Sequence, residues 1–254
     1  ADAALIERAD QQLIRIQEDD ATVQAYVWGE AGTPSVLLIH GWGSRATHLG
    51  AMVKMIVATG FRCVAFDLTA HGRSPGHLNT LPQTVRAARA VASRLIEGPA
   101  LAVIGHSFGG TAACLATCDG PVSGRRIETG TLVTISAPAT LRTMTERFLR
   151  QNALPATHLE GLHQVLWDDH GYRAEDIDLA RLAASLPDRW LVVHDRRDEQ
   201  VPVADAERIQ ASRPDVQLEM TDRYGHVRIL LARPVLPRIA AFLTDPDGLH
   251  QVGD

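Results

Sequence analysis

The sequence predicts an α/β fold, and three observations support this prediction. Short runs rich in Val, Ile and Leu alternate with segments whose apolar residues recur at helical spacing, which is the pattern of a parallel sheet wound with helices. The run "SVLLIHG" (35–41) is apolar almost throughout, as a strand covered on both faces is. A serine between glycines, in "GHSFGG" (105–110), stands where a strand-like run ends and a helical segment begins.

The composition is that of a globular protein. Of the 254 residues, 45% are hydrophobic and 22% are charged, and this length suits one α/β domain with an insertion. The net charge of -5 provides no basic field, so we expect no nucleic acid partner. The chain has no apolar stretch of the roughly 18 residues that a membrane span needs, and its N-terminus is acidic where a signal peptide is basic. We therefore expect a cytoplasmic protein without a membrane span.

The first half of the chain begins with an expected amphipathic helix over residues 1–17, because its apolar residues recur at close to 3.6-residue spacing. This helix either covers a sheet edge or joins a contact in a homodimer. A strand in "ATVQAYVWGE" follows and is expected to be antiparallel. The pattern then predicts, in order, a strand at 35–41, a helix at 49–59, a strand at 63–68, a loop at 69–80 and a helix at 81–97.

The second half supplies four more strands, in "LAVIG", "TLVTIS", "WLVVHD" and "VQLEMT". About fifty residues separate Ser136 from Trp190, well beyond a normal connection, and their apolar residues lie at helix-like spacings. We therefore expect a core formed by residues 1–136 and 190–254, with a helical insertion at 137–189. The tail after Thr244 is expected to be frayed.

The metal-ligating residue types form no metal site. Cys63, Cys114 and Cys118 match neither a C-x-x-C pair nor a zinc ligand set, so we expect reduced, buried thiols. Two groups of histidines lack close ligand spacing and carboxylate support; they are His71 with His77, and His158 with His163 and His170. We expect neither a metal nor a cofactor.

Ser107 lies in a G-x-S-x-G motif, from Gly105 to Gly109, in the strand-turn-helix context that gives this motif its meaning. A serine hydroxyl is a poor nucleophile at neutral pH and needs a base within hydrogen-bonding reach and an acid that orients the base. Two candidate acids stand where "WLVVHDRRDEQVP" ends a predicted strand: Asp195 closes the apolar run and Asp198 comes three residues later. A candidate base, His226, follows the last strand.

With these residues the chain resembles the α/β-hydrolase superfamily. The matching landmarks span nearly the whole chain and comprise "HGWG" (40–43), "DLTAHGRS" (67–74), "GHSFGG" (105–110), "DEQVP" (198–202) and "GH" (225–226). The resemblance implies an eight-stranded, mostly parallel sheet flanked by helices, with a small helical lid. It also implies a catalytic triad of Ser107, Asp198 and His226, while Asp195 remains an alternative acid. Asp222 is interpreted as a turn residue.

The resemblance further implies an oxyanion hole formed by the backbone N–H groups of Trp42 and Phe108, since the tetrahedral intermediate of acyl transfer needs preorganised donors. The Trp42 ring either walls the acyl pocket or packs beside the turn. Four other residues around this centre are expected to be structural: His40 and His106 as hydrogen-bonding groups, and Asp67 with Arg73 as a pair that fixes a loop. The family's usual Pro-Gly is replaced by Thr69-Ala70 in that loop.

A serine nucleophile disfavours the dehalogenases and epoxide hydrolases of this superfamily, which use an aspartate. We therefore predict a carboxylic ester hydrolase whose lid covers an apolar pocket for a small to medium ester. Hydrolysis of a thioester or of a carbon-carbon bond by the same triad is an alternative, and so is a ligand-binding protein without turnover. The esterases that act on acyl-carrier-protein methyl esters are a weaker parallel, since the lid lacks an evident basic cluster.

Overall fold

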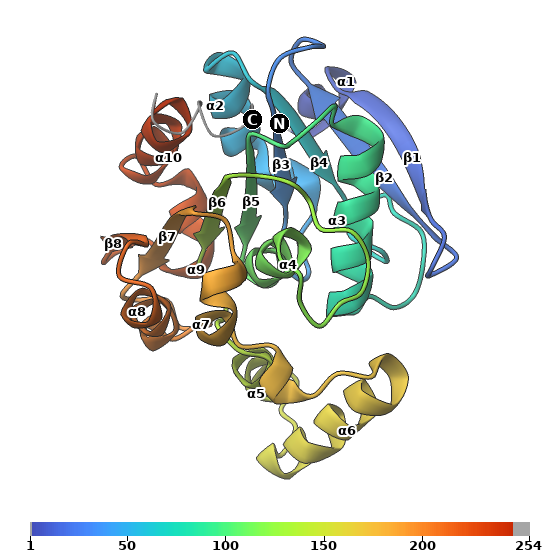
Figure 1. Cartoon of the computed structure of the whole chain (residues 1–254), viewed down its shortest axis with the longest axis vertical. Coiled ribbons are helices and arrows are strands. Elements are labelled where there is room, and N and C mark those ends of the chain that lie inside the picture. Colours follow the sequence, from blue (N-terminus) through green and yellow to red (C-terminus); the bar gives the residue numbers. More distant parts are fainter. Residues whose placement is uncertain (1, 246–254) are drawn as a thin grey trace.

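The computed structural model describes residues 2–245 and contains the expected eight-stranded sheet (Figure 1). The strands lie side by side in the order β1-β2-β4-β3-β5-β6-β7-β8. β2 runs antiparallel to both of its neighbours, and the other adjacent pairs run parallel. The bounds are β1 Asp10–Ile16, β2 Ala21–Trp28, β3 Ser35–Ile39, β4 Arg62–Phe66, β5 Ala102–His106, β6 Thr131–Ile135, β7 Arg189–Asp195 and β8 Gln217–Thr221.

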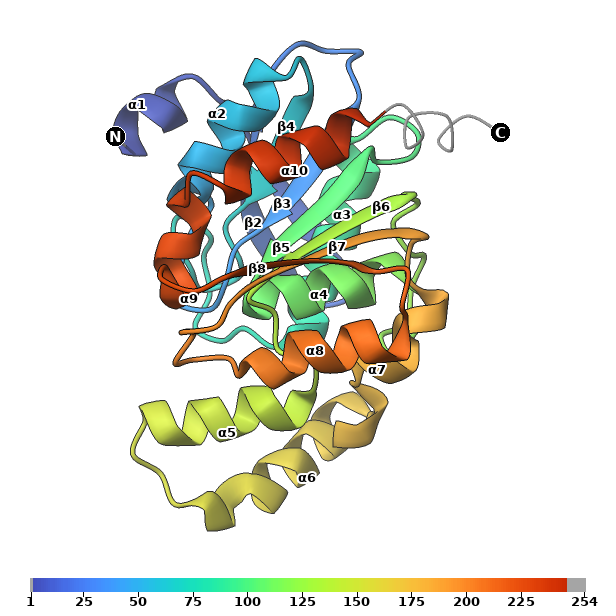
Figure 2. The same cartoon turned by 90° about the vertical axis from the view of Figure 1, so that its left-hand side faces the viewer.

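Helices cover both faces of the sheet, which explains why β3, β5 and β6 are buried at every position (Figures 1 and 2). α3 (Leu81–Leu95), α4 (Phe108–Thr117) and α8 (Val203–Ser212) pack on one face. α2 (Gly50–Ala58) and α10 (Val235–Thr244) pack on the other. The short helix α9 (Gly225–Arg228) leads toward α10 after β8. The predicted α/β class and the mostly parallel sheet are confirmed.

The predicted helix over residues 1–17 is wrong for most of its length. Only Asp2–Glu7 is helical, as α1, whereas Asp10–Ile16 is strand β1. Ile14 and Ile16 are buried while Leu13 is 67% exposed, which is the alternation of a strand with one covered face. The apolar spacing in this segment fits both the 3.6-residue period of a helix and the 2-residue period of a strand. Pairing with β2 selects the strand. The antiparallel start of the sheet, by contrast, is confirmed.

The stretch between β6 and β7 is largely helical and extends beyond the sheet, at the bottom of Figures 1 and 2. It holds α5 (Leu141–Gln151), α6 (Leu159–His170) and α7 (Leu179–Leu182). Thr140 caps α5 and Asp178 caps α7, each accepting backbone N–H groups of the first turn. Residues 137–189 are referred to below as the helical segment. In α6 the side chains of Leu166, Asp169 and His170 lie outside the described part of the structure.

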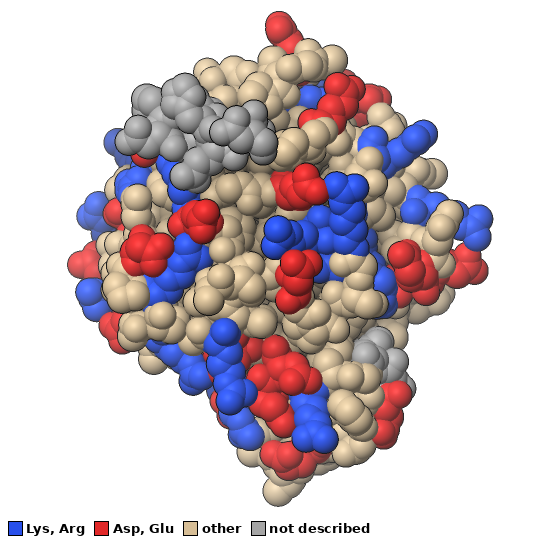
Figure 3. Space-filling view, viewed as in Figure 1, with Lys and Arg blue, Asp and Glu red and all other residues tan. Residues whose placement is uncertain are grey.

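Further expectations concern the thiols, the surface charge, membrane-spanning helices and the C-terminal tail. Cys63, Cys114 and Cys118 are buried and unpaired, and burial raises the pKa of each thiol. Basic and acidic residues are intermixed on the face shown in Figure 3. Within residues 2–245, none of the helices is both long enough and apolar enough to span a membrane. The tail predicted to fray lies, from residue 246 on, outside the described residues.

Candidate active site

Ser107 occupies a sharp turn between β5 and α4. Its backbone φ of 55° and ψ of -125° lie where L residues are rarely found, and its side chain is 1% exposed. The flanking glycines are needed for close approach. A Cβ atom on Gly105 would lie 2.2 Å from the Gly109 carbonyl oxygen, and one on Gly109 would lie 2.4 Å from the His40 carbonyl oxygen. The glycines therefore let the start of α4 lie directly against the ends of β3 and β5.

The structure brings Ser107, His226 and Asp198 into one hydrogen-bonded chain. The Ser107 Oγ lies 2.9 Å from His226 Nε2, and His226 Nδ1 lies 2.8 Å from an Asp198 carboxylate oxygen. All three side chains are buried. They follow β5, β8 and β7, at the carboxyl ends of parallel strands, which is where the crevices of open α/β sheets lie.

The carboxylate determines which nitrogen of His226 carries the proton. An ionised Asp198 can only accept, so Nδ1 donates to it and Nε2 is left to accept the Ser107 hydroxyl proton. The other carboxylate oxygen accepts the backbone N–H groups of Gln200 and Val201, at 2.8 and 2.9 Å. Burial would raise the pKa of Asp198, but the hydrogen bond from His226 and these two N–H groups outweigh it and lower that pKa.

Asp195, the alternative acid, has a different set of partners. One of its oxygens accepts the Thr221 hydroxyl at 2.5 Å and the backbone N–H groups of Arg223 and Tyr224; the other accepts the N–H of Arg197 at 2.9 Å. Burial acts to raise the pKa of Asp195, but these donors outweigh it and lower the pKa to about 2. Asp195 thus ties the loop after β7 to the loop that carries His226, and among the described contacts it makes none with the imidazole. Asp222, the remaining acid, is a bend residue in that loop, as expected.

The loop after β3 lies against Ser107. A Cβ atom on Gly41 would lie 3.1 Å from the Ser107 Cβ, so the chain on either side of Gly41 passes close to Ser107. The ring of Trp42 meets that of Phe108 edge to face, with centroids 5.4 Å apart. The N–H groups of Trp42 and Phe108 therefore belong to two segments that flank Ser107, and the Trp42 ring lines the pocket described below.

Histidines hold these loops in place. His71 accepts the Gly43 N–H at 3.0 Å through Nε2 while its Nδ1 donates to the Thr69 carbonyl, which fixes the loop beyond Trp42. The His40 Nε2 accepts the Leu68 N–H at 2.9 Å. The His106 Nε2 donates to the His226 carbonyl at 2.8 Å. Burial lowers the pKa of His40 to about 4 and that of His106 to about 3, so both are neutral hydrogen-bonding groups at neutral pH.

Asp67 fixes a loop, as predicted, but through backbone groups. Its carboxylate accepts the N–H groups of Arg73 and Ala46, at 2.9 and 2.8 Å, and the hydroxyl of Tyr26. Asp67 and Arg73 thus pair through the Arg73 backbone, while the Arg73 guanidinium donates to Gln11. Ala70, at the position where the family has glycine, adopts a φ of 62°.

Arg147, in α5, reaches Ser107 from the helical segment. Its Nη1 donates to the Ser107 Oγ at 2.9 Å and its Nη2 donates to the Gln200 side-chain oxygen at 2.5 Å. Nothing in the sequence distinguishes Arg147 from Arg142 and Arg150 on the same helix, so this contact was missed. Arg147 therefore places beside Ser107 a cation that the sequence did not predict there.

A mainly apolar pocket of about 290 Å³ lies between the helical segment and the sheet. Rings and aliphatic side chains from both sides line it, among them Trp42, Leu81, Phe108, Met144, Phe148 and Leu162, together with Arg147. Its position and character agree with the apolar pocket that the sequence predicts.

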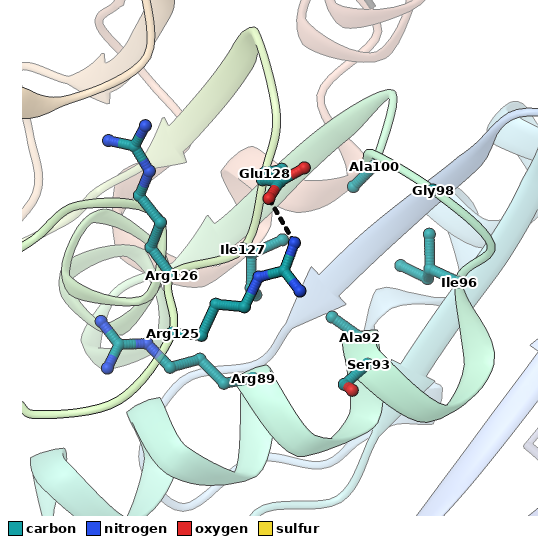
Figure 4. Close-up of a pocket in the computed structure, with 10 residues that line it drawn as sticks. All are labelled: Arg89, Ala92, Ser93, Ile96, Gly98, Ala100, Arg125, Arg126, Ile127 and Glu128. Atoms are coloured by element: carbon teal, nitrogen blue, oxygen red, sulfur yellow. Dashed lines mark hydrogen bonds and ion pairs between the residues drawn. The ribbon is translucent and has the colours of Figure 1, made fainter.

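A second cavity, of about 270 Å³, lies beside α3 near the opposite end of β5 (Figure 4). Its cations are already engaged. The Arg89 guanidinium donates to the carbonyl oxygens of five residues, and the Arg125 side chain pairs with Glu128. Elsewhere among the described residues, no group of three or more His, Cys, Asp or Glu side chains is placed to hold a metal ion.

The chain is similar to known proteins in sequence and in fold. A family model described as "Alpha/beta hydrolase family" matches residues 36–241. Two human proteins, "Serine hydrolase-like protein" and "Serine hydrolase-like protein 2", are each 30% identical to the chain over 106 residues, or 39% of its length. That stretch makes up 50% of the first and 32% of the second, so the chain spans half or less of the length of these curated relatives.

Solved structures show the same fold. An esterase of Pyrococcus furiosus, 24% identical, superposes with a TM-score of 0.70 over 96% of this chain and 93% of that one. A hydrolase from Pseudomonas aeruginosa, 18% identical, superposes with a TM-score of 0.71 over 92% of this chain and 98% of that one.

Proposed function

Because this chain belongs to the alpha/beta hydrolase family, we propose that it is a serine hydrolase that cleaves carboxylic esters through an acyl-enzyme intermediate. One observation carries the proposal. The buried Ser107 Oγ, held on a strained turn, lies 2.9 Å from a histidine whose other nitrogen lies 2.8 Å from the Asp198 carboxylate. The names of the similar proteins, an esterase and serine hydrolase-like proteins, agree with this reaction class.

In the first half-reaction His226 Nε2 takes the Ser107 hydroxyl proton as Oγ attacks the ester carbonyl carbon. Asp198 keeps the imidazole oriented and stabilises the imidazolium that forms. The negative charge on the carbonyl oxygen is met by the backbone N–H groups of Phe108 and Trp42. His226 then donates its proton to the departing alcohol, which leaves the acyl group on Oγ.

In the second half-reaction a water molecule attacks the acyl-enzyme carbonyl while His226 takes one of its protons. The same N–H groups meet the second tetrahedral intermediate. His226 returns the proton to Ser107 Oγ as the carboxylic acid leaves, so the protein ends the cycle unchanged. The chemistry needs neither a metal nor a cofactor.

We assign the helical segment 137–189 the role of a lid over a hydrolase core formed by residues 1–136 and 190–254. The pocket supports this assignment, because Met144, Phe148 and Leu162 come from the segment while Trp42 and Phe108 come from the core. A pocket of about 290 Å³ suits an ester with a small to medium apolar part.

Labelling with a fluorophosphonate, which reacts with activated serines, tests the proposal. We expect the wild-type protein to be labelled and Ser107→Ala not to be. Ser136→Ala, which changes a buried serine at the end of the neighbouring strand β6, is the matched control and should still be labelled. Labelling that survives in Ser107→Ala would place the nucleophile elsewhere, and an unlabelled wild-type protein would favour a ligand-binding role.

A further inference from the structure

Arg147 is a cation without a nearby anion. Its two terminal nitrogens rest on neutral oxygens, those of Ser107 and Gln200, and its Nε is buried without a hydrogen-bond acceptor in the described structure. Among the side chains that the structure describes, no carboxylate forms an ion pair with the guanidinium. Asp198 acts on it only through its longer-range field, and burial lowers the pKa of the Arg147 guanidinium.

A buried guanidinium without an anion lowers the stability of the folded protein unless a bound ligand supplies the anion. Removing a charged group from water carries a penalty that neutral acceptors offset only in part. Arg147 is the charged residue among those that line the apolar pocket, so the lining side chains provide no anion to pair with it. A carboxylate would, because its two oxygens match the fork of guanidinium N–H groups and accept charge-assisted hydrogen bonds.

The position of Arg147 indicates which part of a substrate would carry that carboxylate. The Nη1 atom lies 2.9 Å from Ser107 Oγ, the atom that becomes bonded to the acyl carbon. Arg147 therefore stays beside the acyl group in both half-reactions, whereas the alcohol leaves after the first. The reach of a guanidinium from this point limits the carboxylate to within a few bonds of the scissile carbonyl.

We infer that Arg147 recognises a carboxylate on the acyl part of the substrate, and that preferred substrates are monoesters of short dicarboxylic acids. This inference rests on the proposed function and deepens it. The apolar pocket then takes the aliphatic remainder of the ester, and the hydrogen bond of Arg147 to Ser107 Oγ exchanges for the stronger one to the substrate.

The test compares two substrates of the same shape. In methyl 4-methylpentanoate an isopropyl group replaces the carboxylate of monomethyl succinate, so the ratio of their kcat/KM values, measured by acid release at pH 7.5, isolates the charge. We expect wild type to prefer the monoester of succinate by about 10- to 100-fold, the range of a charge-assisted hydrogen bond. The preference should shrink for the monomethyl esters of adipate and suberate, whose carboxylates lie farther from the carbonyl.

Variants of Arg147 assign the preference to this side chain. Arg147→Met should reduce the ratio by about 10- to 100-fold, and Arg147→Lys, which keeps the charge but not the fork, should retain part of it. Arg150→Met is the matched control, because it removes an exposed guanidinium three residues along the same helix, and it should leave the ratio unchanged.

Two results would overturn the inference: a wild-type protein without a preference for the charged ester, or an Arg147→Met variant in which both kcat/KM values fall equally. The second would mean that Arg147 positions Ser107 and does not read substrate charge. The wild-type ratio needs no variant, so a folding defect cannot hide the answer. Fluorophosphonate labelling of Ser107 does not depend on acyl charge. A protein that is labelled but does not prefer the charged ester would refute only the role of Arg147, whereas a protein that is not labelled would refute the proposed function.

Discussion

The two acids of the β7 loop allow a sharp separation of structural from catalytic effects. Asp195→Asn replaces a carboxylate that accepts four donors by an amide that must turn an N–H₂ group toward some of them. The pKa of Asp195 is lowered from 3.8 to about 2, so its ionised form stabilises the folded state by about 2 kcal/mol at neutral pH, where one pKa unit is worth about 1.4 kcal/mol.

For a chain of this size that loss corresponds to a Tm lower by about 4–8 °C. The sign follows from the direction of the shift. A carboxyl whose pKa is lower in the folded protein stabilises it above the unfolded value, and that stabilisation disappears as the pH falls through about 2. The difference in Tm between wild type and Asp195→Asn should therefore be constant between pH 5 and pH 8.

The matched variant is Asp198→Asn, which removes the acceptor of His226 Nδ1–H. It should lower kcat by about 10⁴-fold, because an amide favours the wrong tautomer of the histidine. Asp195→Asn should lower kcat less than about tenfold at a temperature where both proteins are folded, since its effect on His226 passes through the loop. Thermal unfolding followed by circular dichroism gives Tm, and hydrolysis of a short ester gives kcat. Equal losses of kcat in the two variants would refute the separation of roles.

Two further predictions concern the framework of the site. Gly109→Ala should destabilise the protein by about 3 kcal/mol or more, since its Cβ atom would lie 2.4 Å from two backbone carbonyl oxygens. Gly161→Ala, with open space around it in α6, should instead stabilise the protein by up to about 1 kcal/mol. Similar urea midpoints for the two variants would contradict the packing described. His40 and His106 are neutral in the folded protein but protonate below about pH 6.5 when it unfolds, so each should cost about 2 kcal/mol of stability at pH 5. Urea unfolding at pH 5 and pH 7 measures this, and a His40→Asn variant with the pH dependence of wild type would count against it.

The strands at the centre of the sheet were predictable because each is a short, nearly continuous apolar run. Ser107, Asp198 and His226 were predictable because each stands at or just beyond the end of an expected strand and lies in a stretch that matches a landmark of the family. β1 was not, since an edge strand with one covered face carries too few apolar residues to distinguish a period of 2 from one of 3.6. Arg147 was not predictable either. Its contact with Ser107 depends on how α5 is placed over the sheet, a long-range property that the spacing of charges along one helix does not encode.

Arg147 stands on α5, whereas Ser107, Asp198 and His226 follow β5, β7 and β8. The stretch that bears Arg147 leaves the sheet after β6 and rejoins it at β7, and these strands are neighbours, in register from Thr131 opposite Arg189. A homologous stretch grafted between the same two strands would bring its own charge to Ser107 without replacing Asp198 or His226. Under the proposed function, new substrate ranges would therefore arise by recombination of one contiguous piece of chain, with the proposed triad inherited intact.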